Sequence, residues 1–328
     1  SNALCFHHLQ KTGKFFSAYD LHHYTKGASK AGLDLHSQSI QAINEELCTR
    51  RQQFRKTKLR WRLSKGSRRS LGWIPFKASG IRYQNGQLKY GNQFFGVWDS
   101  YGLSSYVIKS GCFCEDARGR WYACLVVESK ASVTKPEVSR VTTENAIGID
   151  LGLKAFATLS NGEKVEAPKV YRQYEQKLGI AQRAKKKQRV KAIHAKIKNI
   201  RSDFQHKLSR QLVNDHAAIF VGNVNAKGLA QTKLAKSVLD AGWTMFRTML
   251  KYKCENAGVW FEEVNESYTT QTCSCCGSRH NSPKGRAGLR IREWACQGCG
   301  TTHDRDVNAA QNILALGHER LVEGISVL

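Results

Sequence analysis

Two cysteine pairs near the C-terminal end constrain the fold of this chain more than any other feature. Each pair has the spacing Cys-x-x-Cys, and residues 277–295 lie between the pairs. A glycine follows closely in both segments, "CSCCG" and "CQGCG", and allows the tight turn around a metal-bound sulfur. This pattern is typical of a zinc ribbon, in which four sulfurs fill the tetrahedron around Zn²⁺. We predict one structural zinc ion, bound by Cys273, Cys276, Cys296 and Cys299.

The other metal-ligand residues carry weaker signals. Cys275 is the spare cysteine of its segment, because pairing it with Cys273 gives a spacing too short for the usual turn. His280 and His303 rank below the cysteines as ligands, and His303 is expected either to contact a phosphate or to be a surface histidine. The remaining thiols are interpreted as buried or incidental in a reducing compartment: Cys5, Cys48, Cys112, Cys114, Cys124 and Cys254.

The charge of the chain points to a polyanionic partner. Lys and Arg number 52 against 26 acidic residues, which gives a net charge of +26. Self-repulsion at this charge needs a compensating benefit, and nucleic acid supplies one. No stretch approaches the roughly 18 consecutive apolar residues of a membrane span, and the first residues lack the pattern of a secretory signal. We expect a cytoplasmic, nucleoid-associated protein of a prokaryote, with no membrane partner.

Helical and strand patterns alternate along the chain. Residues 4–64 and 170–213 have helical spacing and crowd Lys and Arg, so both are expected to offer a face to phosphates. A solvated helical hairpin remains the alternative for 170–213. Residues 65–80 are interpreted as a connector, 81–130 as a small β domain with a hairpin at Asn85-Gly86, and 131–143 as a polar linker.

The second half of the chain has the pattern of an α/β domain. Residues 144–165 are expected to form a buried strand, a tight turn at Gly152 and an antiparallel strand. A strand at 217–224, one helix over 235–258 and a strand at 259–266 form a predicted βαβ unit with parallel strands. Residues 304–316 are expected to form a final amphipathic helix.

Three acidic residues stand out at the ends of these elements. Asp150 interrupts an apolar strand, and a buried carboxylate needs a metal or an arginine partner. Asp304 and Asp306 open the final helix, and only one of them can cap it. Clustered carboxylates are the ligands of a two-metal site that hydrolyses phosphodiesters.

Taken in order, several segments resemble the TnpB family, the transposon-encoded RNA-guided endonucleases related to type V CRISPR effectors. The resemblance is close over residues 144–316, and these motifs carry it: "GIDLGLKAFATLSNG", "FQHKLSRQLV", "AKSVLDAGWTMFRTMLKYK", "YTTQTCSCCG", "WACQGCG" and "HDRDVNAAQNIL".

The resemblance implies an α/β fold with a RuvC-like, RNase H-type domain interrupted by the zinc ribbon. It also implies an N-terminal helical recognition region and a β wedge domain that hold a guide RNA and the target DNA duplex. In the family a first wedge strand precedes the helices, so a shortened N-terminus is expected here. The domains are then 4–64 (recognition), 65–143 (wedge and linker), 144–266 (first RuvC-like segment, with the helical insertion 170–213), 267–302 (ribbon) and 303–328 (second RuvC-like segment and tail).

The family's active site is Asp, Glu, Asp, and this chain departs from it at the second position. Asp150 and Asp306 match the two aspartates, but Gly222 stands where the glutamate belongs. In an RNase H-type sheet the fifth strand lies beside the fourth, so Glu266, at the exit of the fifth, is expected to supply the second carboxylate. Glu262 and Glu263 lie mid-strand and are weaker candidates. A surface position for Glu266 remains the alternative.

These features predict an RNA-guided, Mg²⁺-dependent DNA endonuclease. Asp150, Glu266 and Asp306 would bind two Mg²⁺ ions, a transposon-derived guide RNA would specify the site, and double-stranded DNA would be cut. The alternative is a nuclease-inactive, RNA-guided DNA-binding protein that acts as a repressor, and Gly222 favours it. A transposase that joins DNA strands itself is a third, weaker possibility.

Overall fold

The computed structural model describes residues 2–57, 59, 62, 63, 65, 66, 69–99, 102–129, 140–280, 282–284, 288 and 290–326. The predicted linker 131–143 therefore lies mostly outside the described residues. The chain divides into two compact units, Ser1–Ser132 and Val133–Leu328. The mixed α/β class is confirmed, and the boundaries of the five predicted domains remain predictions.

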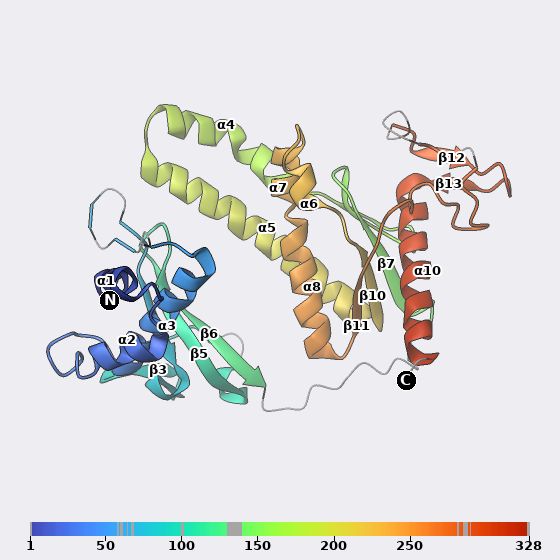
Figure 1. The fold of residues 1–328 in the computed structure, drawn as a ribbon. Coiled ribbons are helices and arrows are strands. Elements are labelled where there is room, and N and C mark those ends of the chain that lie inside the picture. The colour runs from blue at the N-terminus through green and yellow to red at the C-terminus, as the bar shows by residue number, and fades with distance from the viewer. Residues whose placement is uncertain are drawn as a thin grey trace. The chain divides into compact units, whose positions relative to one another are not determined.

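The first unit combines a helical part with two small antiparallel sheets (Figure 1). Its helices are α1 (Asn2–Thr12), α2 (Ala18–Thr25) and α3 (Ser37–Phe54), which confirms the helical character of the N-terminal region. One sheet has the order β1-β5-β6 and the other β2-β3-β4. Their bounds are β1 Trp73–Lys77, β2 Ile81–Gln84, β3 Gln87–Tyr90, β4 Gln93–Gly96, β5 Tyr106–Glu115 and β6 Trp121–Ser129, with 3-10 turns at Ala78–Gly80 and Leu103–Ser105.

Two predictions for this unit, the hairpin at Asn85-Gly86 and the connector at 65–80, can be compared with the structure. The hairpin at Asn85-Gly86 is confirmed: both residues have positive φ, as the tight turn between β2 and β3 requires. The assignment of residues 65–80 to a connector is wrong, because β1 lies within it and pairs with β5. The strand was not predicted because it contains Pro75, and proline is unusual within strands. Because β1 is an edge strand, a residue without an N–H is tolerated there.

The second unit is built on a five-stranded mixed sheet in the order β11-β10-β7-β8-β9. The strands are β7 (Ala146–Leu151), β8 (Ala155–Leu159), β9 (Lys164–Glu166), β10 (Ala218–Gly222) and β11 (Trp260–Val264). Strands β7, β10 and β11 are mutually parallel, whereas β8 is antiparallel to β7 and β9. The predicted βαβ unit and the adjacency of β7, β10 and β11 are confirmed, but β11 ends at Val264, so Glu266 lies two residues beyond it and not within the predicted strand 259–266.

Helices cover both faces of this sheet (Figure 1). On one face, α5 (Lys187–Asp215) and α8 (Trp243–Ala257) bury Leu212, Trp243 and Phe246 against the odd-numbered residues of β7 and β10. On the other face, α10 (Arg305–Ser326) buries Ile313 against the even-numbered ones. Helix α10 lies so close to β7 that a Cβ at Gly148 would stand 2.2 Å from the carbonyl oxygen of Ala310.

The remaining elements are short or extend the basic insertion. Helix α4 (Val170–Arg183) and α5 confirm the helical insertion, while α6 is Ala226–Leu229. The single helix predicted over 235–258 is wrong: α7 (Ala235–Ala241) ends where Gly242 takes a φ of +68°, and α8 starts afresh. Strands β12 (Glu293–Ala295) and β13 (Thr302–Asp304) pair antiparallel. Within the described residues, no helix is long and apolar enough to span a membrane.

Candidate active site and nucleic-acid interface

Strand geometry brings four positions to one corner of the sheet. Side chains alternate between faces along a strand, so even-numbered residues of β7 and β10 point toward α10. Asp150 ends this series on β7, and Gly222 ends it on β10. Val221 pairs with Ile149, so Gly222 and Asp150 are the next residues on neighbouring strands. Asp306 lies in the first turn of α10, on the same side.

Glu266 lies in the space that Gly222 leaves. Gly222 pairs with Val264 on β11, and Glu266 comes two residues after Val264, on the same face. A Cβ built on Gly222 would stand 2.7 Å from Glu266 Oε2 and 3.4 Å from Glu266 Cβ. The backbone N–H of Glu266 donates to Asn223 Oδ1 at 3.3 Å, which ties the turn to the end of β10. The glutamate from the neighbouring strand therefore fills the position where a side chain at residue 222 would begin.

The environment of Asp150 is that of a carboxylate in need of a cation. Burial, together with the nearby carboxylates of Asp306 and Glu266, raises the pKa of Asp150 to about 7, against a smaller opposing effect of Arg305 and Arg292. Burial also raises the pKa of Glu266. Ionising these carboxylates costs free energy unless a cation lies close to them.

The two aspartates at the start of α10 have different partners. Asp304 Oδ1 accepts hydrogen bonds from the backbone N–H groups of Asp306 and Val307, both at 3.0 Å, so Asp304 caps the helix. Asp306 is thereby left for another role, as the sequence suggested. Its carboxylate accepts two bonds from Arg292 Nη1, at 3.0 and 2.9 Å. Sequence reasoning missed Arg292, because nothing in the spacing of the chain marks it among many arginines.

The side chains at this corner have the ligand chemistry of a divalent-cation site. Three carboxylates from β7, the end of β11 and α10 approach one another closely enough to raise the pKa of Asp150, and oxygen ligands suit Mg²⁺. They do not form a tight cluster. Within the described part of the chain, the only groups whose ligand atoms all lie within 4.8 Å of one another are two groups of cysteines. Arg292 takes part of the charge of Asp306 instead.

The four predicted zinc ligands do converge. Sulfurs of Cys273, Cys276, Cys296 and Cys299 all lie within 4.8 Å of one another, and two of the S–S distances are 3.7 Å. Tetrahedral zinc with Zn–S bonds of about 2.3 Å requires S–S distances of about 3.8 Å. Gly277 and Gly300 have positive φ and donate N–H bonds back to the carbonyls of the two leading cysteines, as the predicted turns require. Cys275 is exposed and outside the cluster.

One histidine beside the cluster was misjudged from the sequence. His303 is only 7% exposed, so its interpretation as a surface histidine is wrong. Its Nε2 lies 3.0 Å from Cys273 Sγ, and its ring packs against Trp294. Burial lowers the pKa of His303, which favours the neutral ring, whose N–H can donate one hydrogen bond to Cys273 Sγ. Trp294 and His303 face each other across β12 and β13, which explains the burial.

If the four-cysteine cluster binds structural zinc, removing the ion should destabilise the corner where α10 begins. We expect Cys296→Ser, or treatment with a strong zinc chelator, to lower the melting temperature by at least about 4 °C, because structural zinc supplies folding free energy. Strand β13 leads directly into α10, so the loss should extend to Asp306. Differential scanning fluorimetry measures it, and Cys275→Ser is the matched control. An unchanged melting temperature for Cys296→Ser would contradict a structural role.

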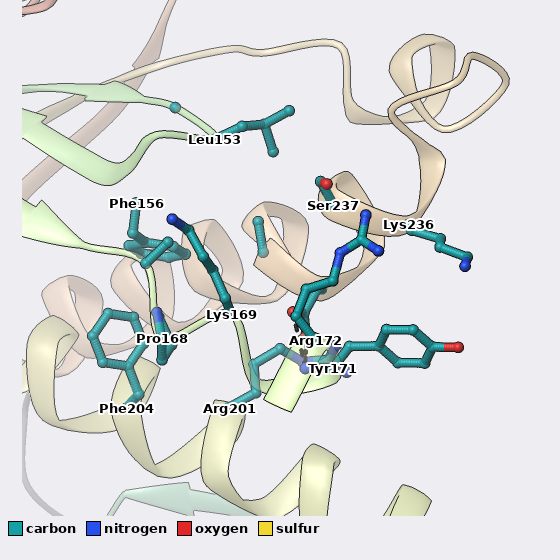
Figure 2. A pocket seen from close by; sticks show the side chains of 14 residues that line it. Leu153, Phe156, Pro168, Lys169, Tyr171, Arg172, Arg201, Phe204, Lys236 and Ser237 are labelled. Carbon is teal, nitrogen blue, oxygen red and sulfur yellow. Dashed lines mark hydrogen bonds between the residues drawn. The ribbon is translucent and has the colours of Figure 1, made fainter. Parts of the chain in front are cut away.

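A basic pocket lies on the insertion side of the second unit. Leu153, Phe156 and Phe204 are among the side chains that line it (Figure 2). The cavity has a volume of about 260 Å³. Four cationic side chains line it: Lys169, Arg172, Arg201 and Lys236. The backbone N–H of Tyr171 donates to both carboxylate oxygens of Asp240 at 3.0 Å, which joins α4 to α7.

Comparison with known families confirms the resemblance to the TnpB family. Residues 126–233 match a family described as "Probable transposase", and residues 243–313 match one described as "Cas12f1-like, TNB domain". The chain is thus a mixed α/β relative of transposon-encoded and type V CRISPR proteins.

Individual relatives agree with this assignment. A protein of Streptomyces pristinaespiralis, named for a proposed RNA-guided DNA endonuclease activity, is 36% identical over 62% of this chain and 51% of its own length. InsQ of Escherichia coli K12, named in the same way, is 33% identical over 77% of this chain and 62% of its own length. The CRISPR-associated endodeoxyribonuclease Cas12f1 of Sulfoacidibacillus thermotolerans is 25% identical over 63% of this chain and 53% of its own.

The matched part of the chain therefore covers between about half and three fifths of the length of these relatives. Among solved structures, one of a Cas12f1-sgRNA-target DNA complex matches over 95% of this chain and 88% of that one, at 14% identity and a TM-score of 0.41.

Proposed function

We propose that this protein is an RNA-guided DNA endonuclease of a transposable element, and that its RuvC-like domain hydrolyses phosphodiester bonds. The observation that carries the proposal is the position of Glu266, whose carboxylate fills the space beside Asp150 that Gly222 leaves. The strand order β11-β10-β7 with a helix beyond it supports an RNase H-type arrangement. The names of the relatives support the substrate class.

Asp150, Glu266 and Asp306 would hold two Mg²⁺ ions. When bound, the ions would lower the pKa of the attacking water and stabilise the leaving oxygen. Asp150 would lose its proton as the ions enter, because its raised pKa reflects burial beside other carboxylates. Asp306 would exchange its pair with Arg292 for metal, which frees that guanidinium to contact a phosphate. Asp304 would hold the start of α10 in place as its cap.

The basic elements would hold the nucleic acids. The helices of the first unit and the β1–β6 sheets would act as recognition and wedge regions, and α4 and α5 would contact phosphates of a guide RNA and its duplex with DNA. We propose that the guide derives from the transposon and that the complex acts on the DNA of a prokaryotic cell. A zinc ion held by the four cysteines of the ribbon would fix the position of the start of α10.

Two experiments in sequence test this function. First, RNA that co-purifies with the protein expressed from its native locus is sequenced, and we expect a defined structured species that ends in a variable segment. Second, a plasmid that carries the complement of that segment is incubated with the complex and Mg²⁺, and we expect cleavage that EDTA abolishes. RNA-free protein would contradict guiding, and bound RNA without cleavage would contradict the nuclease.

A nuclease-inactive, RNA-guided DNA-binding protein is the second candidate. The ion pair of Arg292 with Asp306 favours it, because an arginine already neutralises one of the three carboxylates. In that case the protein would occupy its DNA target without cutting. Target-dependent retention of the plasmid in a filter-binding assay, with no nicked or linear product at any Mg²⁺ concentration, is the outcome that would establish it.

A further inference from the structure

Three cysteines of the first unit converge on one face of the β1-β5-β6 sheet. Cys112 and Cys114 lie on β5, and Cys124 lies on β6. Their sulfurs all lie within 4.8 Å of one another, and Cys114 Sγ and Cys124 Sγ are 3.3 Å apart. The sequence suggested scattered, incidental thiols. That interpretation is wrong for this group, which is the other cysteine cluster of the described chain besides the ribbon.

Strand register explains the convergence and keeps the cluster out of the core. Cys124 stands directly opposite Cys112, and Cys114 follows two residues later on the same face. The opposite face carries Phe113, Ala123 and Leu125, which pack in the core of the first unit. Cys124 itself is exposed, as is its neighbour Tyr122. The three sulfurs are therefore prearranged by backbone pairing and reachable from solvent.

A disulfide accounts for the arrangement less well. Cys114 and Cys124, whose sulfurs are 3.3 Å apart, are diagonal neighbours across the strands. Diagonal Cα atoms lie about 7–8 Å apart, beyond the usual limit of about 6.8 Å for a disulfide. A bond between the directly opposite Cys112 and Cys124 would leave the third sulfur without a role. All three are used together only when they bind a common atom.

We propose that Cys112, Cys114 and Cys124 form a second metal site, which binds one thiophilic cation, Zn²⁺ or Cu⁺, through three thiolates. Soft sulfur ligands select these ions. Within the described residues, no fourth cysteine, histidine or carboxylate joins the group, so the fourth position of a tetrahedral ion would face solvent. The site is independent of the ribbon, which lies in the other unit.

The test is a metal count on the full chain under anaerobic, reducing conditions. In one arm the protein is loaded with Zn²⁺, desalted and measured by plasma mass spectrometry, and we expect two zinc ions per chain. In the other arm protein with one zinc in the ribbon receives Cu⁺, and we expect one copper in addition. The variant Cys112→Ser/Cys124→Ser should lose one equivalent, whereas Cys275→Ser, at an exposed cysteine outside both clusters, should lose none.

The metal count has two outcomes. A second zinc, or a copper beside one zinc, that disappears in the double variant supports the site and identifies the ion. Equal metal content of wild type and double variant in both arms overturns it. If the double variant does not fold, Cys114→Ala is compared instead, with alkylation of Cys124 as an added readout. Metal should slow the alkylation of Cys124 at least about tenfold in the wild type but not in Cys114→Ala, and a wild-type rate that metal leaves unchanged would refute the proposal.

Discussion

Replacing Glu266 with glutamine is expected to lower the rate of guided, Mg²⁺-dependent DNA cleavage by about a hundredfold or more. The amide keeps the shape of the side chain in the space beside Gly222 but removes the negative charge that a divalent cation needs. Losses of this size are typical when one group that stabilises charge in a transition state is removed. The rate of plasmid cleavage with a saturating guide measures it, while retention of the guide RNA reports an intact fold.

Glu262→Gln is the matched control for this variant. Glu262 lies on β11, four residues earlier and pointing to the same face, but it pairs with Arg320 at 3.1 Å, away from the corner. Its loss should leave cleavage within about twofold of the wild-type rate, since partly exposed ion pairs contribute little. Equal losses for the two variants would mean that Glu266 has no special place, and full activity of Glu266→Gln would remove it from the site.

The second large effect concerns the stability of the metal-free protein as a function of pH. Burial and the neighbouring carboxylates raise the pKa of Asp150 to about 7, whereas an unfolded aspartate titrates near about 3.9. Between these values the folded chain holds a proton that the unfolded chain has released. Stability from this group is therefore fully present below about pH 4 and is lost as the pH rises through 7.

Asp150→Asn should remove this dependence. Relative to the wild type, the variant should gain about 3 kcal/mol in free energy of unfolding between pH 5 and pH 8, because the wild type loses on the order of 1.4 kcal/mol for each pH unit up to its folded pKa. Mg²⁺ should raise the melting temperature of the wild type at pH 8 and leave that of the variant unchanged. Denaturant melts at the two pH values, with and without Mg²⁺, measure both effects. If the variant and the wild type differ in free energy of unfolding by the same amount at pH 5 and at pH 8, the raised pKa of Asp150 is contradicted.

Much of this site was predictable because it depends on strand order and parity. An aspartate after the apolar run "AIGI", a glycine at the exit of one strand and a glutamate at the expected exit of the next are read from the sequence, and period-2 alternation places them on one face. The two cysteine pairs were equally clear. In both cases the local pattern and the tertiary arrangement depend on the same spacing.

Other features required the three-dimensional structure. Arg292 reaches Asp306 from the ribbon, and the burial of His303 depends on the pairing of two three-residue strands. The cluster of Cys112, Cys114 and Cys124 depends on the register of β5 against β6, which hydrophobic pattern alone did not give. The strand that contains Pro75 was missed because an edge strand tolerates a proline. The break at Gly242 was missed because a left-handed residue there divides the predicted helix into two.

Moving the carboxylate back across the two strands gives the sharpest test of the central idea, that the side chain of residue 266 takes the role expected of residue 222. The measurement is the guided cleavage rate of Gly222→Glu/Glu266→Gly, compared with Glu266→Gly alone. We predict that the single variant is inactive and that the double variant recovers to within about tenfold of wild type, since one glutamate again reaches the corner beside Asp150. A double variant as inactive as the single one, or a single variant that cuts normally, would contradict it.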